Sequence, residues 1–243
     1  MINPYEHHWG RTELLVGAEG TAELAAARVA VYGLGGVGGY VAEALARAGV
    51  GYLRLVDGDV VAPSNRNRQL VALSSTEGQS KAEVMAARIR DINPNVQLEV
   101  HARFMTPGDV DAFTANIGYA IDAIDMVATK VALLTTLRQA GVFTVSCMGA
   151  ACKRDPAGVR IADISETREC PLAKRVRWRL RRAGVATGIT CVYSEERRDA
   201  MYDTRDANRG RKRFVQGSIS YLPGIVGLTA AGVVAQQILA PRR

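Results

Sequence analysis

Cysteine and histidine are scarce in this sequence of 243 residues, and neither type is clustered. The four cysteines form no CxxC pair and stand apart at Cys147, Cys152, Cys170 and Cys191. Zinc ribbons use paired CxxC motifs, and small disulfide-rich domains have a denser cysteine framework. The three histidines show no metal-ligand spacing. We therefore expect no zinc and no disulfide framework, and we expect reduced thiols, as in a cytoplasmic protein.

Features of export and of membrane insertion are also missing. Residues 1–10 are polar, and Glu6, His7 and His8 occupy the region where a signal peptide would carry its apolar core. One uncharged, mostly apolar run covers residues 219–235, but it is only 17 residues long and contains Pro223. A spanning helix needs roughly 20 apolar residues. We expect no membrane association and interpret this run as a buried core or subunit-interface helix.

The charge of the chain is distributed unevenly. The 31 Lys and Arg residues exceed the 24 Asp and Glu residues, which gives a net charge of +7. Residues 174–213 contain 13 of the basic and 5 of the acidic residues and carry +8, so the remainder carries −1. A concentrated basic segment is typical of proteins that bind a polyanion such as nucleic acid. A solubilising face is the alternative interpretation.

Strand and helix signals alternate along the first two thirds of the chain. Short apolar runs predict strands at residues 28–33, 52–57, 96–100, 119–124 and 142–147. Helical spacing and end signals predict helices at residues 36–48, 80–92 and 126–140. With 48% apolar residues, the chain can bury a sizeable core. The pattern predicts an α/β protein with a Rossmann-like, doubly wound, mostly parallel sheet.

The last third shows a different organisation. Strands are predicted at residues 159–164 and 189–193, and a helix is predicted at residues 171–183. We expect these elements to form a C-terminal α/β extension that continues the sheet. Residues 195–216 are polar and charged without an apolar period, which predicts a mobile loop.

A glycine-rich segment follows the first predicted strand and opens the first predicted helix. In GLGGVG the glycines are Gly33, Gly35, Gly36 and Gly38. Glycines allow a tight turn and a close approach to a phosphate, whose charge helix N-terminal amides can meet. Asp57 ends the next strand, where a carboxylate can accept a ribose hydroxyl. This pattern fits NAD or another adenine nucleotide, and tight packing of helix on sheet is the alternative.

The residues after Asp57 favour ATP over NAD. Asp59 follows closely, Arg68 lies in the run SNRNRQL, Lys81 begins a helix, and Asp125 follows a strand. A triphosphate carries about four negative charges that need cations and Mg²⁺, and Mg²⁺ needs a carboxylate. Each residue has a structural alternative: Arg68 could pair with Asp59, Lys81 could be solvated, and Asp125 could cap a helix.

These motifs resemble a known family. GLGGVG, VDGD, SNRNRQ, Lys81 and DAID, with RTELLVG from Arg11 onward, are similar to the adenylating domain of the HesA/MoeB/ThiF family, relatives of ubiquitin-activating enzymes. The resemblance implies one domain over residues 1–243. It implies an ATP-binding part at about residues 20–150 and a basic C-terminal substrate and dimer part at residues 151–243. It also implies an enzyme that transfers AMP to a carboxylate.

The resemblance implies roles for individual residues. It assigns the ATP site to Gly33, Gly35, Gly36, Gly38, Asp57, Asp59, Asn65, Arg68 and Lys81. It assigns catalytic roles to Arg11, Arg68, Lys81 and Asp125. Asp57 would bind the ribose, and Asp125 would hold Mg²⁺. Arg11 would reach into the ATP site of a partner subunit, so a homodimer is implied.

The C-terminal third indicates a subfamily. The segment KRDPAGVRIADISETRECPLAKRVRWRLRRAGV, the strand CVYSEE and the terminal GSISYLPGIVGLTAAGVV resemble the tRNA threonylcarbamoyladenosine dehydratases. The resemblance implies ATP-dependent cyclisation of the threonylcarbamoyl group on the adenosine beside the anticodon. Its carboxylate would be adenylated, and an internal nucleophile would close the ring. It leaves open a bound monovalent cation and a sulfur-relay accessory protein.

tRNA contacts are expected from the basic segment, because phosphates can be held by Arg and Lys without reading sequence. The candidates are Arg175, Arg177, Arg179, Arg181, Arg182, Arg209, Arg211, Lys212 and Arg213. Trp178 and Tyr193 could stack a base, although we expect packing for both. Two alternatives stay open: adenylation of the C-terminal glycine of a ubiquitin-like sulfur carrier, and a non-catalytic nucleotide-binding module that docks RNA.

Overall fold

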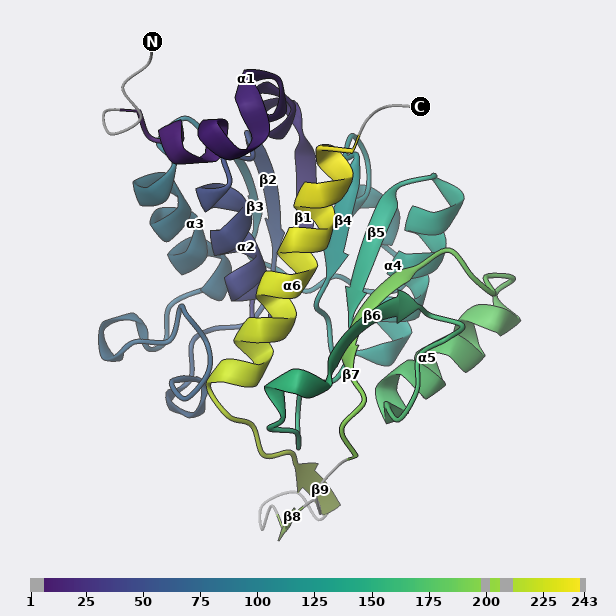
Figure 1. The fold of residues 1–243 in the computed structure, drawn as a ribbon. Coiled ribbons are helices and arrows are strands. Elements are labelled where there is room, and N and C mark those ends of the chain that lie inside the picture. Colours follow the sequence, from purple (N-terminus) through teal and green to yellow (C-terminus); the bar gives the residue numbers. More distant parts are fainter. Residues whose placement is uncertain (1–6, 198–201, 206–211, 241–243) are drawn as a thin grey trace.

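The computed structural model describes residues 7–197, 202–205 and 212–240 and contains a seven-stranded sheet between two helical layers (Figure 1). The strands lie in the order β3-β2-β1-β4-β5-β7-β6. Their bounds are β1 Arg28–Tyr32, β2 Tyr52–Val56, β3 Gln97–His101, β4 Tyr119–Asp122, β5 Phe143–Cys147, β6 Val159–Asp163 and β7 Thr190–Ser194. All neighbours pair in parallel except β6, which runs antiparallel to β7. The predicted fold class is confirmed.

Helices cover both faces of the sheet. On one face lie α2 (Gly38–Arg47), α3 (Lys81–Ile92) and α6 (Tyr221–Ile238), and on the other lie α4 (Val127–Gln139) and α5 (Pro171–Arg182) (Figure 1). Short 3-10 helices occur at η1 Pro63–Asn65, η2 Ser74–Thr76, η3 Val110–Phe113 and η4 Pro156–Gly158. The alternation of helix and parallel strand predicted from the sequence therefore produces the expected doubly wound arrangement.

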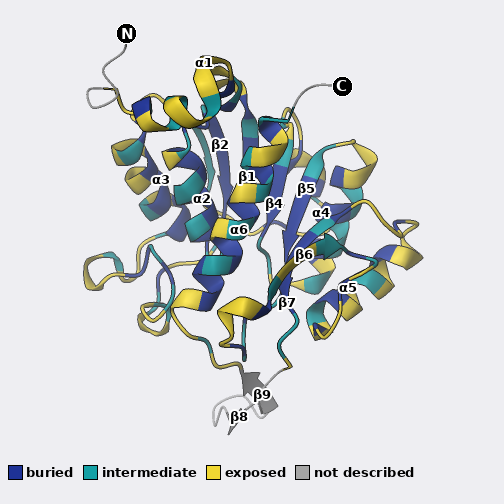
Figure 2. Cartoon of the chain, in the orientation of Figure 1, coloured by how far each residue is buried: buried dark blue, intermediate teal, exposed yellow. Residues whose placement is uncertain are grey.

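The apolar strands are buried because each of their faces contributes to a different core. Val29 and Val31 of β1 belong to the cluster under α2, α3 and α6, whereas Ala30 and Tyr32 belong to the cluster under α4 and η3. Successive side chains of a strand point to opposite faces, so a strand covered on both sides is apolar throughout. Figure 2 shows this continuous buried layer between helices whose outer faces are exposed.

The C-terminal third extends the same sheet, as predicted. Strand β7 pairs with β5, and β6 forms the edge beyond it. Helix α5 packs against α4 through a separate apolar cluster that contains Val176, Leu180 and Cys191. The position of β7 beside β5 places the start of α5 at the same edge of the sheet as the loops that follow β4 and β5 (Figure 1).

Two features differ from the sequence predictions. Helix α1 (Gly10–Ala26) was not anticipated; Gly17, with φ 75°, interrupts its helical backbone, and its hydrophobic pattern is weak. Residues 195–216 do not form a loop throughout, because β8 (Tyr202–Arg205) and β9 (Lys212–Val215) pair in an antiparallel hairpin. Strand pairing of this kind rests on backbone hydrogen bonds, so a polar segment without an apolar period can still adopt it.

Helix α6 is long and apolar enough to cross a membrane by length and composition, and half of it is buried inside the protein. It begins at Tyr221, within the apolar run of residues 219–235, and packs against α2 and the sheet. Gly227 allows this close packing, because a Cβ atom there would meet the carbonyl oxygen of Val37 at 2.4 Å. The run was predicted to form a buried core or subunit-interface helix, and the buried half of α6 packs into the core.

Candidate active site

The largest group of predicted site residues surrounds one pocket at the carboxyl edge of the sheet. The pocket has a volume of about 790 Å³ and is lined by the loops that follow β1, β2, β4 and β5 and by the start of α5. Ligands of open α/β sheets bind at this edge. The predicted residues that line the pocket are Gly33, Gly35, Gly36, Asp57, Asp59, Asn65, Arg68, Lys81 and Asp125.

The glycine-rich loop connects β1 to α2 through two backbone positions that exclude a side chain. Gly33 has φ 86°, which favours glycine, and a Cβ atom there would lie 2.8 Å from the carbonyl oxygen of Ala123. Gly38 begins α2, and a Cβ atom there would lie 1.7 Å from the carbonyl oxygen of Gly33. The loop therefore turns tightly enough to aim the N-terminus of α2 toward the pocket.

Asp57 connects the loops that follow β1 and β2. Its Oδ2 accepts a hydrogen bond from the backbone N–H of Leu34 at 2.6 Å, and its Oδ1 accepts one from Asp59 at 2.8 Å. Burial raises the pKa of Asp57 above its ordinary value, and these two backbone hydrogen bonds oppose that effect. The carboxylate therefore holds the glycine-rich loop in place while it lines the pocket.

Two basic residues approach the same loop. Lys81 is the first residue of α3, is almost fully buried, and its Nζ lies 2.9 Å from Oδ2 of Asp59. Arg68 donates to the carbonyl oxygen of Ser64 at 3.1 Å and to Asn67 at 2.7 Å. The stem of Arg68 also packs on Gly36, because a Cβ atom there would lie 3.2 Å from Arg68 Cγ. Asp59 thus pairs with Lys81 rather than with Arg68.

Two polar side chains beside Arg68 complete this part of the pocket. Oδ1 of Asn65 accepts a hydrogen bond from the backbone N–H of Ala62 at 3.1 Å, which fixes the turn at η1. Gln69, which the sequence interpretation missed, is buried and lines the pocket. Its Oε1 has no hydrogen-bond partner in the described structure, so it is available to accept a hydrogen bond from a ligand.

A buried ion pair supports the loop that carries Asp125. Asp122, the last residue of β4, lies 2.7 Å from Nζ of Lys130, and both side chains are fully buried. Lys130 also donates to the carbonyl oxygens of Ile124 at 3.0 Å and Cys147 at 2.9 Å, which joins the ends of β4 and β5. Asp125 follows this anchored segment, is exposed, and forms no ion pair in the described part of the chain.

Arg11 is the one predicted catalytic residue that the fold places elsewhere. It is exposed on α1, which packs at the amino edge of the sheet: the N–H of Gly51, just before β2, donates to Leu24 at 3.3 Å. The pocket is lined by residues that follow the carboxyl ends of β1, β2, β4 and β5, and Figure 1 shows these strand ends at the opposite edge of the sheet. Within one chain, Arg11 is therefore not brought to the other site residues.

The predicted tRNA-binding residues divide into three groups. Arg175 lines the pocket, and Arg179, Arg181 and Arg182 are exposed on α5. Arg177 instead donates to the carbonyl oxygens of Ile164 at 3.2 Å and Thr167 at 2.8 Å. Arg209 and Arg211 lie outside the described residues, and Lys212 and Arg213 belong to β9, of which only the backbone is described.

Comparison with known proteins assigns the family. A model of the ThiF family matches residues 10–242. The chain belongs to the ThiF family. It is 40% identical over 241 residues to the tRNA threonylcarbamoyladenosine dehydratase of Bacillus subtilis (strain 168), with 96% of this chain and 95% of that protein covered.

Solved structures of a ThiF-family enzyme match the fold. The crystal structure of Escherichia coli tRNA N6-threonylcarbamoyladenosine dehydratase, TcdA, in complex with ATP superposes with a TM-score of 0.85, at 33% identity and with 98% and 96% of the two chains covered. The same enzyme in complex with AMP gives 0.86. The SAMP-activating enzyme E1 of Haloferax volcanii is 38% identical over 142 residues, 58% of this chain and 52% of that protein.

The cysteines of this ThiF-family chain lie mostly in the core. Cys147, Cys170 and Cys191 are buried, and burial raises the pKa of Cys147 to about 12 and also raises the pKa of Cys191. A thiolate is the nucleophilic form of cysteine, so burial of this kind disfavours covalent chemistry at these two thiols. The described residues contain no cluster of three or more His, Cys, Asp or Glu side chains that could hold a metal ion.

The ThiF-type pocket also contains two residues that the sequence interpretation did not select. Arg103 and Phe104 line it after β3, and Phe104 is exposed. Gly58 allows this approach, because a Cβ atom there would lie 2.4 Å from the backbone nitrogen of Phe104. No local pattern marks the pair, since the contact joins two loops that are far apart in sequence.

Proposed function

We propose that this chain uses ATP to dehydrate threonylcarbamoyladenosine in tRNA, beside the anticodon. The threonyl carboxylate attacks the α-phosphate of ATP and displaces pyrophosphate, which gives a mixed anhydride with AMP. An internal nucleophile of the same group then attacks the activated carbonyl, closes a ring and releases AMP. The oxygen lost from the carboxylate leaves on AMP, so the nucleoside loses one water. Tethering of the nucleophile makes an enzyme thiol unnecessary.

One observation carries this proposal. The pocket that contains the glycine-rich loop, Arg68 and Lys81 also contains Arg175 and the start of the basic helix α5. The proposed nucleotide site and the basic helix that we propose for tRNA would therefore meet at one place. The full-length similarity to named tRNA threonylcarbamoyladenosine dehydratases, and the ATP and AMP complexes of TcdA, support the same activity.

The residues of the pocket fit ATP. Gly33, Gly35, Gly36 and Gly38 would let phosphates approach the N-terminus of α2, where amides and the helix dipole favour negative charge. Asp57 would accept a ribose hydroxyl, and the unpartnered Oε1 of Gln69 can accept a further hydrogen bond. The nucleotide site that we propose consists of Gly33, Gly35, Gly36, Gly38, Asp57, Asp59, Asn65, Arg68, Gln69 and Lys81.

Within this site, Arg68 and Lys81 would neutralise charge that develops on the transferred phosphate and on pyrophosphate. Lys81 is held by Asp59 and Arg68 by Ser64 and Asn67, so both cations are oriented before the substrate binds. Preorganised charges stabilise a transition state more than mobile ones, because they need little reorganisation. These two residues therefore carry the largest part of the proposed electrostatic catalysis.

We propose Asp125 as the Mg²⁺ ligand. Mg²⁺ that accompanies a nucleotide is usually held by one or two carboxylates together with phosphate oxygens and water. The exposed carboxylate of Asp125 lines the pocket and has no ion-pair partner in the described chain, so it fits this arrangement. Asp125→Asn should weaken the dependence of AMP release on Mg²⁺, which a Mg²⁺ titration measures. An unchanged titration would contradict the assignment.

We further propose that the protein is a cytoplasmic homodimer in which each chain is a single adenylating domain. Arg11 is on α1, which packs near the start of β2, and it does not line the pocket of its own chain, so it would act in the pocket of a partner subunit. Mixing equal amounts of an Arg11→Ala chain and a Lys81→Ala chain should restore about a quarter of the activity if the sites are shared, because half of the dimers are mixed and each mixed dimer has one intact site. Native mass spectrometry of the same preparation would reveal the dimer, a bound monovalent cation and a sulfur-relay partner.

The tRNA would bind along the basic C-terminal part. We propose Arg175, Arg179, Arg181 and Arg182 for its phosphates, together with Arg209, Arg211, Lys212 and Arg213. Arg177 is bonded to backbone carbonyls and contributes to the fold of this region instead. Substituting exposed arginines should weaken binding similarly for different tRNA sequences and reduce its salt dependence.

Conversion of tRNA tests the function directly. The protein is incubated with ATP, Mg²⁺ and tRNA that bears threonylcarbamoyladenosine, and the nucleosides are then analysed by mass spectrometry. We expect the modified nucleoside to lose the mass of one water, with release of AMP and pyrophosphate. An unchanged mass with protein that binds ATP would refute the proposal.

The same preparation distinguishes the alternatives. Pyrophosphate exchange that depends on a small protein ending in Gly-Gly, and not on tRNA, would indicate activation of a sulfur carrier. Cells in which both Arg68→Ala and Lys81→Ala leave the tRNA modification intact would indicate a non-catalytic nucleotide-binding module. The proposed enzyme predicts severe loss of the modification in both variants.

A further inference from the structure

Helix α5 presents two faces with opposite chemistry. Ala173, Val176 and Leu180 are buried against α4 and β7. An α-helix turns about 100° per residue, so positions 171, 175, 178 and 182 share the face opposite to this core. On that outer face lie Arg175, Trp178 and Arg182, which we call the outer stripe of α5. All three of these residues are exposed.

Trp178, the aromatic residue of the outer stripe, is unusually exposed. Trp178 is 57% exposed, although packing was expected from the sequence, and that expectation is wrong. Tyr193, for which packing was also expected, is buried. The contact of Trp178 is with Arg182, whose guanidinium carbon lies 4.7 Å from the ring centroid. One face of the indole can therefore be held by a cation while the ring remains open to a ligand.

The outer stripe is continuous with the active-site pocket. Pro171 and Arg175 line the pocket at the start of α5. A helix rises about 1.5 Å per residue, so Trp178 stands about 5 Å beyond Arg175 along the helix axis and Arg182 about 10 Å beyond it. A substrate whose reactive group enters the pocket would place its neighbouring units along this stripe.

Charge and rigidity make the stripe suitable for RNA. Residues 171–182 contain six basic and no acidic side chains. Arg177, on the inner side of the helix, holds α5 to the preceding segment through the carbonyl oxygens of Ile164 and Thr167 and through Thr167 Oγ1 at 2.5 Å. Trp178 therefore lies on a helix that is anchored to the rest of the protein, and not on a loop.

We propose that Trp178 stacks on an unpaired base of the tRNA, adjacent to the modified adenosine, with Arg182 on the ring. The inference rests on the proposed function, since it names which part of the tRNA the protein holds. Aromatic side chains and arginine planes recognise unstacked bases of single-stranded loops, whereas an RNA duplex offers mainly phosphates and hydroxyls. An exposed indole beside arginines is thus matched to a loop and not to a stem.

Tryptophan fluorescence provides a direct test. The chain has two tryptophans, so a Trp9→Phe variant reports on Trp178 alone. An anticodon stem-loop RNA should quench this emission, and a blunt duplex with the same stem sequence should not. In filter binding with the otherwise unmodified chain, Trp178→Ala should lower the affinity for the stem-loop about tenfold to a hundredfold. Trp178→Phe, which keeps a stacking ring, should retain most of that affinity.

Arg181→Ala is the matched control, since it removes an exposed charge of the same helix without changing the aromatic ring. It should weaken stem-loop and duplex binding equally and reduce the salt dependence of both. ATP affinity should be unchanged in Trp178→Ala, which shows that the variant is folded. Equal binding of the stem-loop by Trp178→Ala and the unmodified chain, without quenching, would overturn the stacking proposal alone. Absence of binding to either RNA would overturn both this proposal and the proposed function.

Discussion

Lys81 and Asp59 form an ion pair at the entrance to the site, with Nζ of Lys81 2.9 Å from Oδ2 of Asp59. The backbone N–H of Lys81 also donates to the carbonyl oxygen of Asp59 at 3.0 Å. The lysine side chain is 6% exposed and the aspartate 54%. The cation is therefore held at the start of α3 by a carboxylate that solvent can still reach, and a bound polyphosphate would share it.

Removal of this cation should affect catalysis more than folding. Lys81→Ala should slow tRNA-dependent AMP release about a hundredfold or more, because a preorganised charge at the reacting phosphate is lost. The exposed Asp59 remains solvated, so the midpoint of urea unfolding should change little. Asp59→Asn is the control, because it leaves the lysine charge in place and should reduce the rate less. Similar rates in Lys81→Ala and the unmodified chain would exclude Lys81 from catalysis.

The close approach of Gly38 to Gly33 predicts a strict requirement for glycine. In Gly38→Ala the new Cβ atom would lie 1.7 Å from the carbonyl oxygen of Gly33, so the loop must move. We expect a loss of stability of about 1–3 kcal/mol, typical of overpacking, and a large loss of ATP affinity. Urea unfolding and calorimetric titration with ATP measure the two effects.

Gly108→Ala serves as its control, since no atom lies within 4 Å of a Cβ atom at that position. It should leave both the unfolding midpoint and the ATP affinity unchanged. ATP binding by Gly38→Ala at the affinity of the unmodified chain would contradict the proposed position of the phosphates.

The buried pair of Asp122 and Lys130 should be important for stability. Lys130→Met leaves the Asp122 carboxylate buried without its cation, so we expect a loss of about 3–5 kcal/mol in the free energy of unfolding. The double variant Asp122→Asn/Lys130→Met removes both charges and should recover part of this loss. Urea denaturation of the unmodified chain, Lys130→Met, Asp122→Asn and the double variant measures the coupling between the two residues. A single variant no less stable than the double one would show that the pair has no such role.

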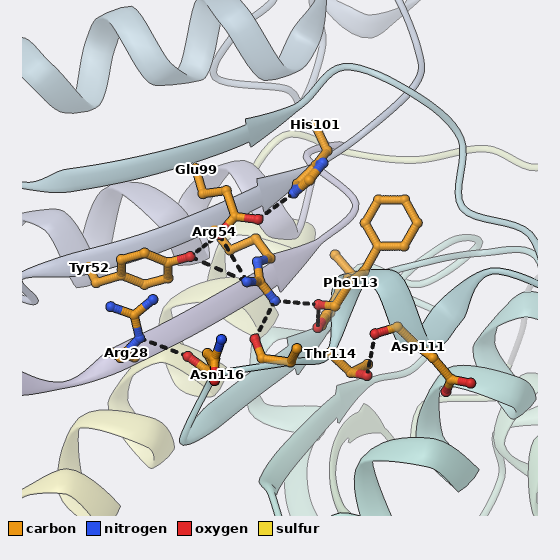
Figure 3. Close-up of polar contacts among 11 residues, drawn as sticks. Arg28, Tyr52, Arg54, Glu99, His101, Asp111, Phe113, Thr114 and Asn116 are labelled. Atoms are coloured by element: carbon orange, nitrogen blue, oxygen red, sulfur yellow. Dashed lines mark hydrogen bonds and ion pairs between the residues drawn. The ribbon is translucent and has the colours of Figure 1, made fainter.

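A polar network around Arg54 of β2 predicts that the free energy of unfolding falls at acidic pH. Arg54, which is buried, donates to Glu99 at 2.9 Å and to the carbonyl oxygens of Phe113 and Ala115 (Figure 3). Partial burial raises the pKa of Glu99, but hydrogen bonds from Arg54, Tyr52 and His101 outweigh it and lower the pKa to about 2. The ionised carboxylate therefore stabilises the folded chain.

The sign of the effect follows from this lowered pKa. The stabilisation is complete above the pKa of an unfolded glutamate, about 4.3, and disappears as the pH falls toward 2. Between these values the unmodified chain should lose unfolding free energy more steeply than Glu99→Gln. Because Glu99 is 37% exposed, solvent screening should keep the difference modest. Parallel slopes in urea titrations across this range would contradict the assignment.

Local sequence patterns were sufficient to predict the features that neighbouring residues determine. A helix was predicted at residues 80–92, and the Oγ of Ser80 accepts a hydrogen bond from the N–H of Glu83 at the start of α3. Gly33 and Gly38 were expected in a tight turn, which their packing confirms. These features depend on residues that are neighbours in the chain, so the sequence predicts them without knowledge of the fold.

Other features depend on contacts between distant segments. Lys130 stands in an apolar helical run, and nothing nearby in sequence shows that it pairs with Asp122 and the carbonyl oxygen of Cys147. Gln69 becomes notable only because its Oε1 is buried without a partner. The sequence alone does not show whether Trp178 is buried or exposed. It is exposed because α5 packs on α4 through its other face.

For this protein, the order and periodicity of residues were enough for the α/β class, the positions of most strands and helices, and the glycine-rich nucleotide motif. These properties arise from backbone conformation and from apolar spacing, which are local. The tertiary structure alone decided which charges meet, that Arg11 lies away from its own pocket, that Arg177 supports the fold, and that Trp178 faces outward beside Arg182. Those outcomes depend on the order of strands in the sheet, because that order brings residues separated by many positions into contact.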